Sequence, residues 1–266
     1  MIKKRNLILA ALLSLLVPGL GHVYAGDAKK GGILVGIEFG LLLLGGLAGV
    51  LSTFYGIAFF ILFIISFYIF VIISSVKLAN KNSEYFLKPY NRWYWYLVIW
   101  VVMTAITNAI FSYRGMVLGY ETYSMFHKSM VPTLQVGDYI TVNTRYKHPS
   151  IGDVVVFRNP KDRNIPYVKR VVAIGNDLVS IKDGEVIRNG KIVHELSIEE
   201  SRRKMDFSIS MTEVKVPENE IFLLGDWRDK SRDSRFWGTV PNEDVIGKVT
   251  YIWYSKDVSR IGKKVK

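Results

Sequence analysis

Ser129 is the residue in this sequence with the clearest potential for nucleophilic chemistry. It belongs to the segment Lys128-Ser129-Met130-Val131-Pro132-Thr133-Leu134. Proline disfavours helical conformation in the residue before it, so we expect the run from Ser129 to Val131 to be extended. A serine hydroxyl attacks poorly unless a base takes its proton. The rest of the chain must therefore supply that base.

Lys169 is a better candidate for this base than any histidine. The chain has no Cys and four His. On a strand His127 would point to the same face as Ser129, beside the hydroxyl and not against it. Lys169 lies in a β-branched run, where burial can lower a lysine pKa until the neutral amine accepts a proton. Its neighbour Arg170 is always charged and cannot accept one. The alternatives are an ordinary surface serine and a strand lysine whose stem covers apolar surface.

Five segments, in this order, resemble the successive boxes of bacterial type I signal peptidases. They cover roughly residues 124 to 252, and the last is fourteen residues long. The five are Ser129-Met130-Val131-Pro132-Thr133-Leu134, Gly137-Asp138-Tyr139-Ile140, Gly152-Asp153-Val154-Val155-Val156-Phe157, Tyr167-Val168-Lys169-Arg170-Val171-Val172, and Gly225-Asp226-Trp227-Arg228-Asp229-Lys230-Ser231-Arg232-Asp233-Ser234-Arg235-Phe236-Trp237-Gly238.

The resemblance implies a Ser-Lys dyad that needs neither cofactor nor metal. By its place in the last box, Ser231 resembles the hydroxyl that orients the family's lysine. Asp233 and Arg235 resemble a structural ion pair beside the site. An oxyanion hole needs two donors, of which the Ser129 backbone N–H supplies one. Where some family members place a second donor, a serine hydroxyl, this chain has His127.

The expected substrate is the extended, small-residue cleavage segment of a signal peptide. Such a segment can add as a strand to exposed edges of the enzyme. The resemblance puts those edges at residues 125–128 and 167–168. The apolar candidates for the pocket wall, each of which could equally be ordinary core, are Met130, Leu134, Ile140, Tyr167 and Val168.

The elements that must position these residues divide into two regions of different composition. The chain has 266 residues, 50% of them hydrophobic, and a net charge of +12. Residues 1–113 carry only nine Lys or Arg and three Asp or Glu, which is membrane composition. Residues 114–266 have ordinary globular charge and form the predicted second domain. The positive charge suits anionic lipid headgroups, and no motif for nucleic acid accompanies it.

The first region predicts membrane helices. Residues 31–50, 54–76 and 93–113 are each about one membrane thickness long. Residues 7–24 contain Pro and Gly and have basic residues on both sides, so we expect a re-entrant or interfacial hairpin, with a full span as the alternative. The basic segment 77–92 should be cytoplasmic, which places Ser129 outside.

The second region predicts a mostly β domain, and the resemblance implies the β fold that signal peptidases share with self-cleaving repressors. Short alternating runs predict the strands, and Asp183-Gly184 and Asn189-Gly190 predict tight turns between strands. The polar stretch 195–215 is expected to be a loop away from the chemistry. The predicted strands are 139–143, 154–157, 167–174, 178–182, 186–189, 221–224 and 249–254.

We therefore expect a serine endopeptidase of the bacterial inner membrane that cleaves signal peptides from exported preproteins on the extracytoplasmic side. One alternative is a narrower peptidase that serves a single secretion or conjugation apparatus. Another is an inactive membrane-bound relative that acts as a binding protein, although the presence of both Ser129 and Lys169 disfavours it. A self-cleaving repressor is disfavoured by the membrane helices.

Overall fold

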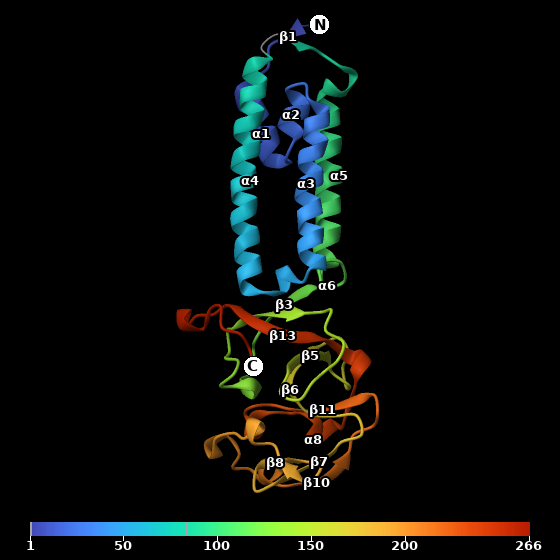
Figure 1. Cartoon of the computed structure of the whole chain (residues 1–266), viewed down its shortest axis with the longest axis vertical. Coiled ribbons are helices and arrows are strands. Elements are labelled where there is room, and N and C mark those ends of the chain that lie inside the picture. Colours follow the sequence, from blue (N-terminus) through green and yellow to red (C-terminus); the bar gives the residue numbers. More distant parts are fainter. Residues whose placement is uncertain (1, 83–84) are drawn as a thin grey trace. The chain divides into compact units, whose positions relative to one another are not determined.

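The computed structural model describes residues 2–82 and 85–266, which form two compact units (Figure 1). The helical unit contains the chain up to Leu51 together with Tyr55–Leu118. The β unit contains Ser52–Phe54 and Gly119–Lys266. Two residues of the predicted cytoplasmic segment 77–92, Ser83 and Glu84, lie outside the described residues.

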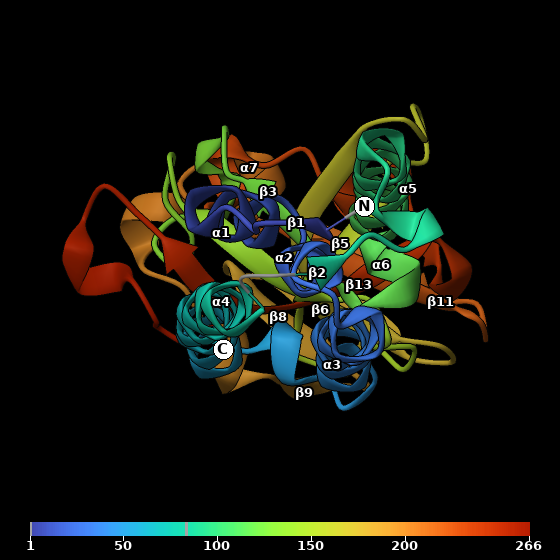
Figure 2. The same ribbon diagram turned by 90° about the horizontal axis from the view of Figure 1, so that it is seen from above.

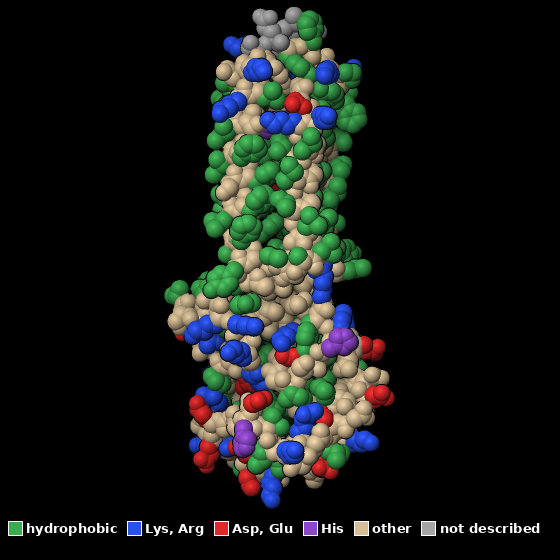
Figure 3. All heavy atoms as spheres, in the orientation of Figure 1, with side chains coloured by type: hydrophobic (Ala, Val, Ile, Leu, Met, Phe, Trp, Pro, Cys, Tyr) green, Lys and Arg blue, Asp and Glu red, His purple; other side chains and the backbone are tan. Residues whose placement is uncertain are grey.

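Three helices of the described chain are long and apolar enough to cross a membrane. They are α3 (Ala28–Leu47), α4 (Phe54–Lys81) and α5 (Trp93–Ser112), of 20, 28 and 20 residues. Each overlaps one predicted span, and α4 continues five residues beyond the predicted end at residue 76. Apolar side chains cover the middle of this unit in Figure 3, as expected for helices that face lipid.

The predicted hairpin at residues 7–24 consists of two short helices, α1 (Leu7–Leu16) and α2 (Leu20–Tyr24). Ten residues give α1 about half the length that a membrane crossing needs. The turn between the helices uses Gly19 at a φ of +90°, and a side chain there would collide with the backbone of Gly31. Seen end-on in Figure 2, α2 lies among α1, α3, α4 and α5.

Short elements complete the helical unit. Strand β1 (Ile2–Lys3) pairs antiparallel with β2 (Tyr85–Phe86), and α6 (Arg114–Val117) follows α5. Glu38 of α3 accepts a hydrogen bond from Tyr68 of α4 at 3.4 Å. This acidic residue of α3 therefore contacts the adjacent helix α4.

The β unit is built from two antiparallel sheets. The larger has the strand order β12-β11-β6-β5-β13-β4-β3 and the smaller has the order β10-β7-β8-β9. Both are rich in β-branched residues, which favour strands. The strands are β3 (Tyr120–Ser124), β4 (Tyr139–Asn143), β5 (Val154–Arg158), β6 (Pro166–Ile174), β7 (Leu178–Lys182), β8 (Glu185–Arg188), β9 (Lys191–Ile192), β10 (Met211–Lys215), β11 (Glu220–Leu224), β12 (Val240–Pro241) and β13 (Val245–Tyr254).

The seven predicted strands and both predicted turns are confirmed. Asp183-Gly184 joins β7 to β8, and Asn189-Gly190 joins β8 to β9. All four turn residues have positive φ, as the tight hairpin turn requires.

Two local expectations were wrong. The residues Lys128–Met130 form a 3₁₀ turn, closed by the Val131 N–H donating to the Lys128 carbonyl at 3.1 Å, and are not extended. The steric effect of Pro132 reaches only Val131, which has extended angles. The stretch 195–215 is also not a remote loop, because it contains β10 and a short helix, α7 (Asp206–Ile209).

Candidate active site

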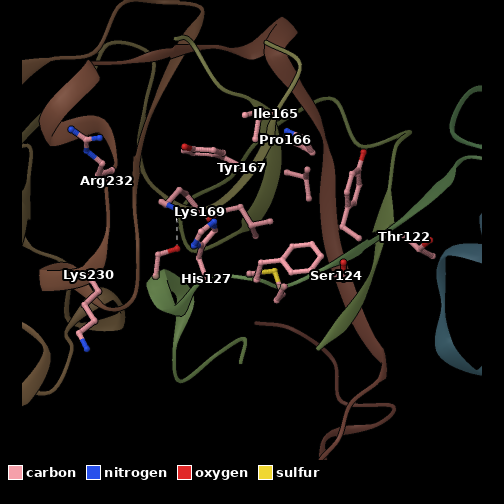
Figure 4. A pocket seen from close by; sticks show the side chains of 15 residues that line it. Thr122, Ser124, His127, Ile165, Pro166, Tyr167, Lys169, Lys230 and Arg232 are labelled. Carbon is pink, nitrogen blue, oxygen red and sulfur yellow. Dashed lines mark hydrogen bonds between the residues drawn. The ribbon is translucent and has the colours of Figure 1, made fainter. Parts of the chain in front are cut away.

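Ser129 and Lys169 meet beside a cavity of about 600 Å³ in the β unit (Figure 4). The 3₁₀ turn presents Ser129, and β6 presents Lys169. Lys169 Nζ lies 3.0 Å from Ser129 Oγ, a contact drawn as a dashed line in Figure 4. The amine also donates to the Val168 carbonyl at 3.0 Å. When the neutral amine donates one of its hydrogens to the Val168 carbonyl, its lone pair remains free to accept the Ser129 proton.

The surroundings of Lys169 favour its neutral form. The side chain is buried, with only 4% of the residue exposed. This burial lowers the pKa of Lys169 to about 8, against the opposing effect of the Asp233 and Asp226 carboxylates. A lysine with a pKa lowered in this way is neutral far more often at pH 7 than one at the ordinary value. The site can therefore supply a base at neutral pH.

Ser231 is buried near the dyad. Its Oγ has no hydrogen-bond partner among the described residues. A side chain built on Gly225 would collide with both Ser231 Oγ and the Ser129 carbonyl. These two groups therefore pack directly against Gly225, where no side chain larger than hydrogen fits. The predicted orienting hydroxyl is thus brought to the site, without a hydrogen bond to Lys169.

Asp233 and Arg235 form a buried ion pair, with Arg235 Nε 2.8 Å from Asp233 Oδ1. Asp233 Oδ2 also accepts from the Gly225 N–H at 3.0 Å. Arg235 donates to the carbonyls of Arg228, Ser231 and Phe207 at 2.7, 3.3 and 3.0 Å. The pair therefore links Gly225, Arg228 and Ser231 within the last box. It also binds Phe207, which belongs to the 195–215 stretch, to that box.

A second charged network, which is not apparent from the sequence, ties the boxes to each other. Arg170 binds Asp226 through two hydrogen bonds, of 2.8 and 2.7 Å. Thr133 Oγ1 donates to the same carboxylate at 2.5 Å. The network joins the Ser129 segment, β6 and the last box, so it ties together the three segments that carry Ser129, Lys169 and Ser231. The only signal in the sequence was that each residue stands within a motif.

Arg228 is another structural residue that the sequence analysis did not single out. It is 1% exposed and donates to the carbonyls of Gly225 and Leu196 at 2.9 and 3.3 Å. Burial lowers the pKa of Arg228 to about 10, which leaves the guanidinium charged at neutral pH. Its role is to fill the interior of the last box.

The cavity has two strand-like walls. One consists of β3 and the residues that follow it, Thr122–His127, and the other of residues Ile165–Lys169. β3 is the outermost strand of its sheet. In β6, pairing with β11 begins at Arg170, so the residues before it pair only with β5 among the described residues. The cavity therefore lies between the outermost strand β3 and the part of β6 that precedes its pairing with β11.

The predicted pocket residues divide between this wall and the core. Tyr167 and Val168 line the cavity, as does His127. Met130, Leu134 and Ile140 have 0% exposure and belong to a core cluster. These three do not line the cavity, because their strand and turn positions point them inward. Lys230 and Arg232, not predicted as cavity residues, line it too (Figure 4).

Comparison with known proteins gives consistent similarities. Residues 91–254 match the family described as signal peptidase, peptidase S26. Signal peptidase I of Buchnera aphidicola is 28% identical over 258 residues, covering 67% of this chain and 78% of that protein. Probable signal peptidase I-2 of Synechocystis is 35% identical over 182 residues, covering 65% and 78%. A solved signal peptidase I from Enterococcus faecalis is 24% identical, with a TM-score of 0.34, and covers 40% of this chain and 99% of its own.

Proposed function

This chain belongs to the signal peptidase family, peptidase S26, and on that basis we propose that it is a membrane-anchored endopeptidase in which Ser129 and Lys169 cleave signal peptides from exported preproteins. Membership of this family makes the chain a serine peptidase. The observation that carries the choice of residues is the 3.0 Å contact between Lys169 Nζ and Ser129 Oγ, made by a lysine of lowered pKa.

In the proposed reaction Lys169 takes the proton of Ser129 as Oγ attacks the scissile carbonyl carbon. The peptide C–N bond of the tetrahedral intermediate then breaks, and the protonated amine of Lys169 gives its proton to the leaving nitrogen. The acyl-enzyme that remains is an ester on Ser129. Lys169 next removes a proton from the attacking water, and the proton returns to Oγ when the acid product leaves. The Ser129 backbone N–H serves as an oxyanion donor.

Ser231 has a supporting role in this proposal. Its buried hydroxyl, which lacks another partner among the described residues, is available to orient the Lys169 amine in the working enzyme. Asp233 and Arg235 fix the backbone on which Ser231 stands. None of the three exchanges a proton with substrate.

The substrate segment is proposed to lie between the edges of the two strand walls that line the cavity. Backbone hydrogen bonds to such edges give affinity without regard to sequence, and pockets for alternate side chains give selectivity. Tyr167, Val168 and Met125 line the cavity together with Ser129, and in this proposal they limit the size of the substrate side chains that fit there. His127 also lines the cavity and can donate a second hydrogen bond to the oxyanion.

We propose that α3, α4 and α5 anchor the enzyme in the bacterial inner membrane, with the β unit on the extracytoplasmic side. The support is their length and apolar composition, and the basic residues between α4 and α5. Exported preproteins emerge on that side, so the cavity would meet its substrate there.

The test is cleavage of one purified preprotein by the detergent-solubilised full chain. Wild type should release the signal peptide, and Ser129→Ala should not. Ser201→Ala, which changes an exposed serine of the β unit, is the matched control and should cleave at the wild-type rate. Cleavage by Ser129→Ala at the rate of this control would exclude Ser129 as the nucleophile.

A further inference from the structure

The helical unit has a cavity of its own, of about 380 Å³, at the C-terminal end of α4. Its polar lining consists of Lys30 from the first turn of α3 and Ser74, Lys77 and Lys81 from α4. Its apolar lining consists of Phe70, Ile73 and Leu78. The proposed peptidase reaction uses none of these residues.

The polar side of the cavity is strongly cationic. Lys77 and Lys81 stand one helical turn apart, where like charges repel, and Lys30 adds a third positive charge. No acidic residue lines the cavity within the part of the chain that the structure describes. The nearby Asp27 carboxylate accepts the Lys30 backbone N–H at 2.8 Å and caps α3. An anion placed among the three ammonium groups would relieve their repulsion.

A chain of two hydrogen bonds holds Lys30 in position. Lys30 Nζ donates to Ser74 Oγ at 2.7 Å, and Ser74 Oγ lies 3.0 Å from Nε2 of the fully buried His22. His22 belongs to α2, whose position depends on the close approach of Gly19 to Gly31. The short helix therefore fixes the Lys30 ammonium against α4. Figure 3 shows Lys and Arg side chains gathered near this end of the helical unit.

The apolar side determines what kind of anion fits. Phe70 and Ile73 precede the lysines along α4, and they are 55% and 50% exposed. A rise of about 1.5 Å per residue separates Phe70 from Lys81 by roughly 16 Å. A ligand with a phosphate at the lysines and hydrocarbon chains along Phe70 and Ile73 would use both sides. Free phosphate would use only the first.

We propose that this cavity binds the phosphate headgroup of an anionic phospholipid, with the acyl chains lying along Phe70 and Ile73. The phosphate is held by Lys30, Lys77 and Lys81. The helices therefore do more than anchor the chain, because they select the lipid next to α4. This proposal concerns lipid binding alone and does not depend on peptidase activity.

Native mass spectrometry of the full chain in detergent tests the proposal, with phosphatidylglycerol and phosphatidylcholine as probes. Wild type should bind phosphatidylglycerol at least about tenfold more tightly, and each single Lys→Gln change at the three positions should weaken it roughly fivefold. The triple Gln variant should show no preference between the lipids. The triple Arg variant, which keeps the charges, should retain the preference and shows that the positions tolerate substitution.

A triple variant of Lys4, Lys29 and Lys88 to Gln removes the same charge from exposed positions outside the cavity and should behave like wild type. An equal loss in this control would mean that general charge attracts the lipid, and the site would be rejected. Equal binding of phosphatidylcholine by wild type would also reject it. Displacement of phosphatidylglycerol by inorganic phosphate at the same free concentration would assign the cavity to free phosphate and overturn the lipid proposal.

Discussion

Lys169 Nζ lies 3.0 Å from Ser129 Oγ across 40 positions of sequence. The backbone on either side is fixed independently of this contact. The Trp227 N–H donates to the Ser129 carbonyl at 2.9 Å, and Arg170, next to Lys169, binds Asp226. The backbone segments that carry Ser129 and Lys169 are therefore both attached to the last box. Because Ser129 and Lys169 act as a unit in the proposed reaction, substitutions of the two residues should have similar effects.

Ser129→Ala, Lys169→Ala and the double variant should each lower kcat by roughly 10³-fold or more, and by similar amounts. The reason is that a serine without its base is as inactive as a base without its serine. Single-turnover cleavage of a purified preprotein measures the three rates. If the double variant were slower by the product of the two single effects, the residues would be acting separately.

Ser231→Ala should separate catalysis from stability. The Ser231 hydroxyl makes no hydrogen bond among the described residues, so its loss should leave the free energy of unfolding nearly unchanged. If it orients Lys169, kcat should fall by roughly tenfold to a hundredfold while KM stays close to wild type. Steady-state kinetics and thermal unfolding together measure both effects.

Ser234→Ala is the matched control for Ser231. Ser234 Oγ accepts a hydrogen bond from the buried Leu223 N–H at 3.0 Å, so this change should cost about 1–3 kcal/mol of stability with little effect on kcat. Wild-type kcat in Ser231→Ala would remove Ser231 from the account of catalysis.

Arg235→Ala should destabilise the β unit by about 3–5 kcal/mol, because it leaves the buried Asp233 carboxylate uncompensated. Arg202→Ala breaks an ion pair with Glu199 in which the glutamate is 68% exposed, and it should cost about 0–1 kcal/mol. Chemical denaturation of the two variants compares them. Equal losses would mean that the Asp233–Arg235 pair is no more structural than a surface pair.

Single cysteines can test the proposed topology, since the chain has no Cys of its own. Lys88→Cys lies between α4 and α5 and Ser201→Cys lies in the β unit, and both positions are exposed. In intact cells a membrane-impermeant thiol reagent should label residue 201 and leave residue 88 unlabelled. Labelling of residue 88 alone would reverse the orientation and place the candidate active site on the wrong side for exported proteins.

Much of the β unit could be predicted because its signals are local. β-branched runs such as Val154–Val156 and turn pairs such as Asp183-Gly184 determine structure within a few residues. β3 and β10 were not predicted, because Tyr120–Ser124 and Met211–Lys215 are polar and alternate weakly. Their strand conformation depends on pairing with β4 and β7, which local sequence does not report.

The site could be predicted only as far as its motifs extend. Ser129 and Lys169 stand in segments whose composition indicates their environment. The sequence could not show that Met130, Leu134 and Ile140 are core residues and not pocket residues. Residues of both kinds are apolar and follow the same alternation along the chain. The link between Arg170 and Asp226 is a tertiary contact between two motifs. The sequence of neither motif indicates that the two residues lie close together in the fold.

The pH dependence of kcat/KM tests the central claim, that Lys169 is the base, most directly. Burial lowers the pKa of Lys169 to about 8, and only the neutral amine can accept the Ser129 proton. The rate should therefore fall about tenfold per pH unit below pH 8 and level off above it, because kcat/KM reports the free enzyme. Below that pH the amine is protonated and inactive. A rate independent of pH between about 6 and 9, or an unchanged limb in Lys169→His with full activity, would contradict the account and direct attention to His127.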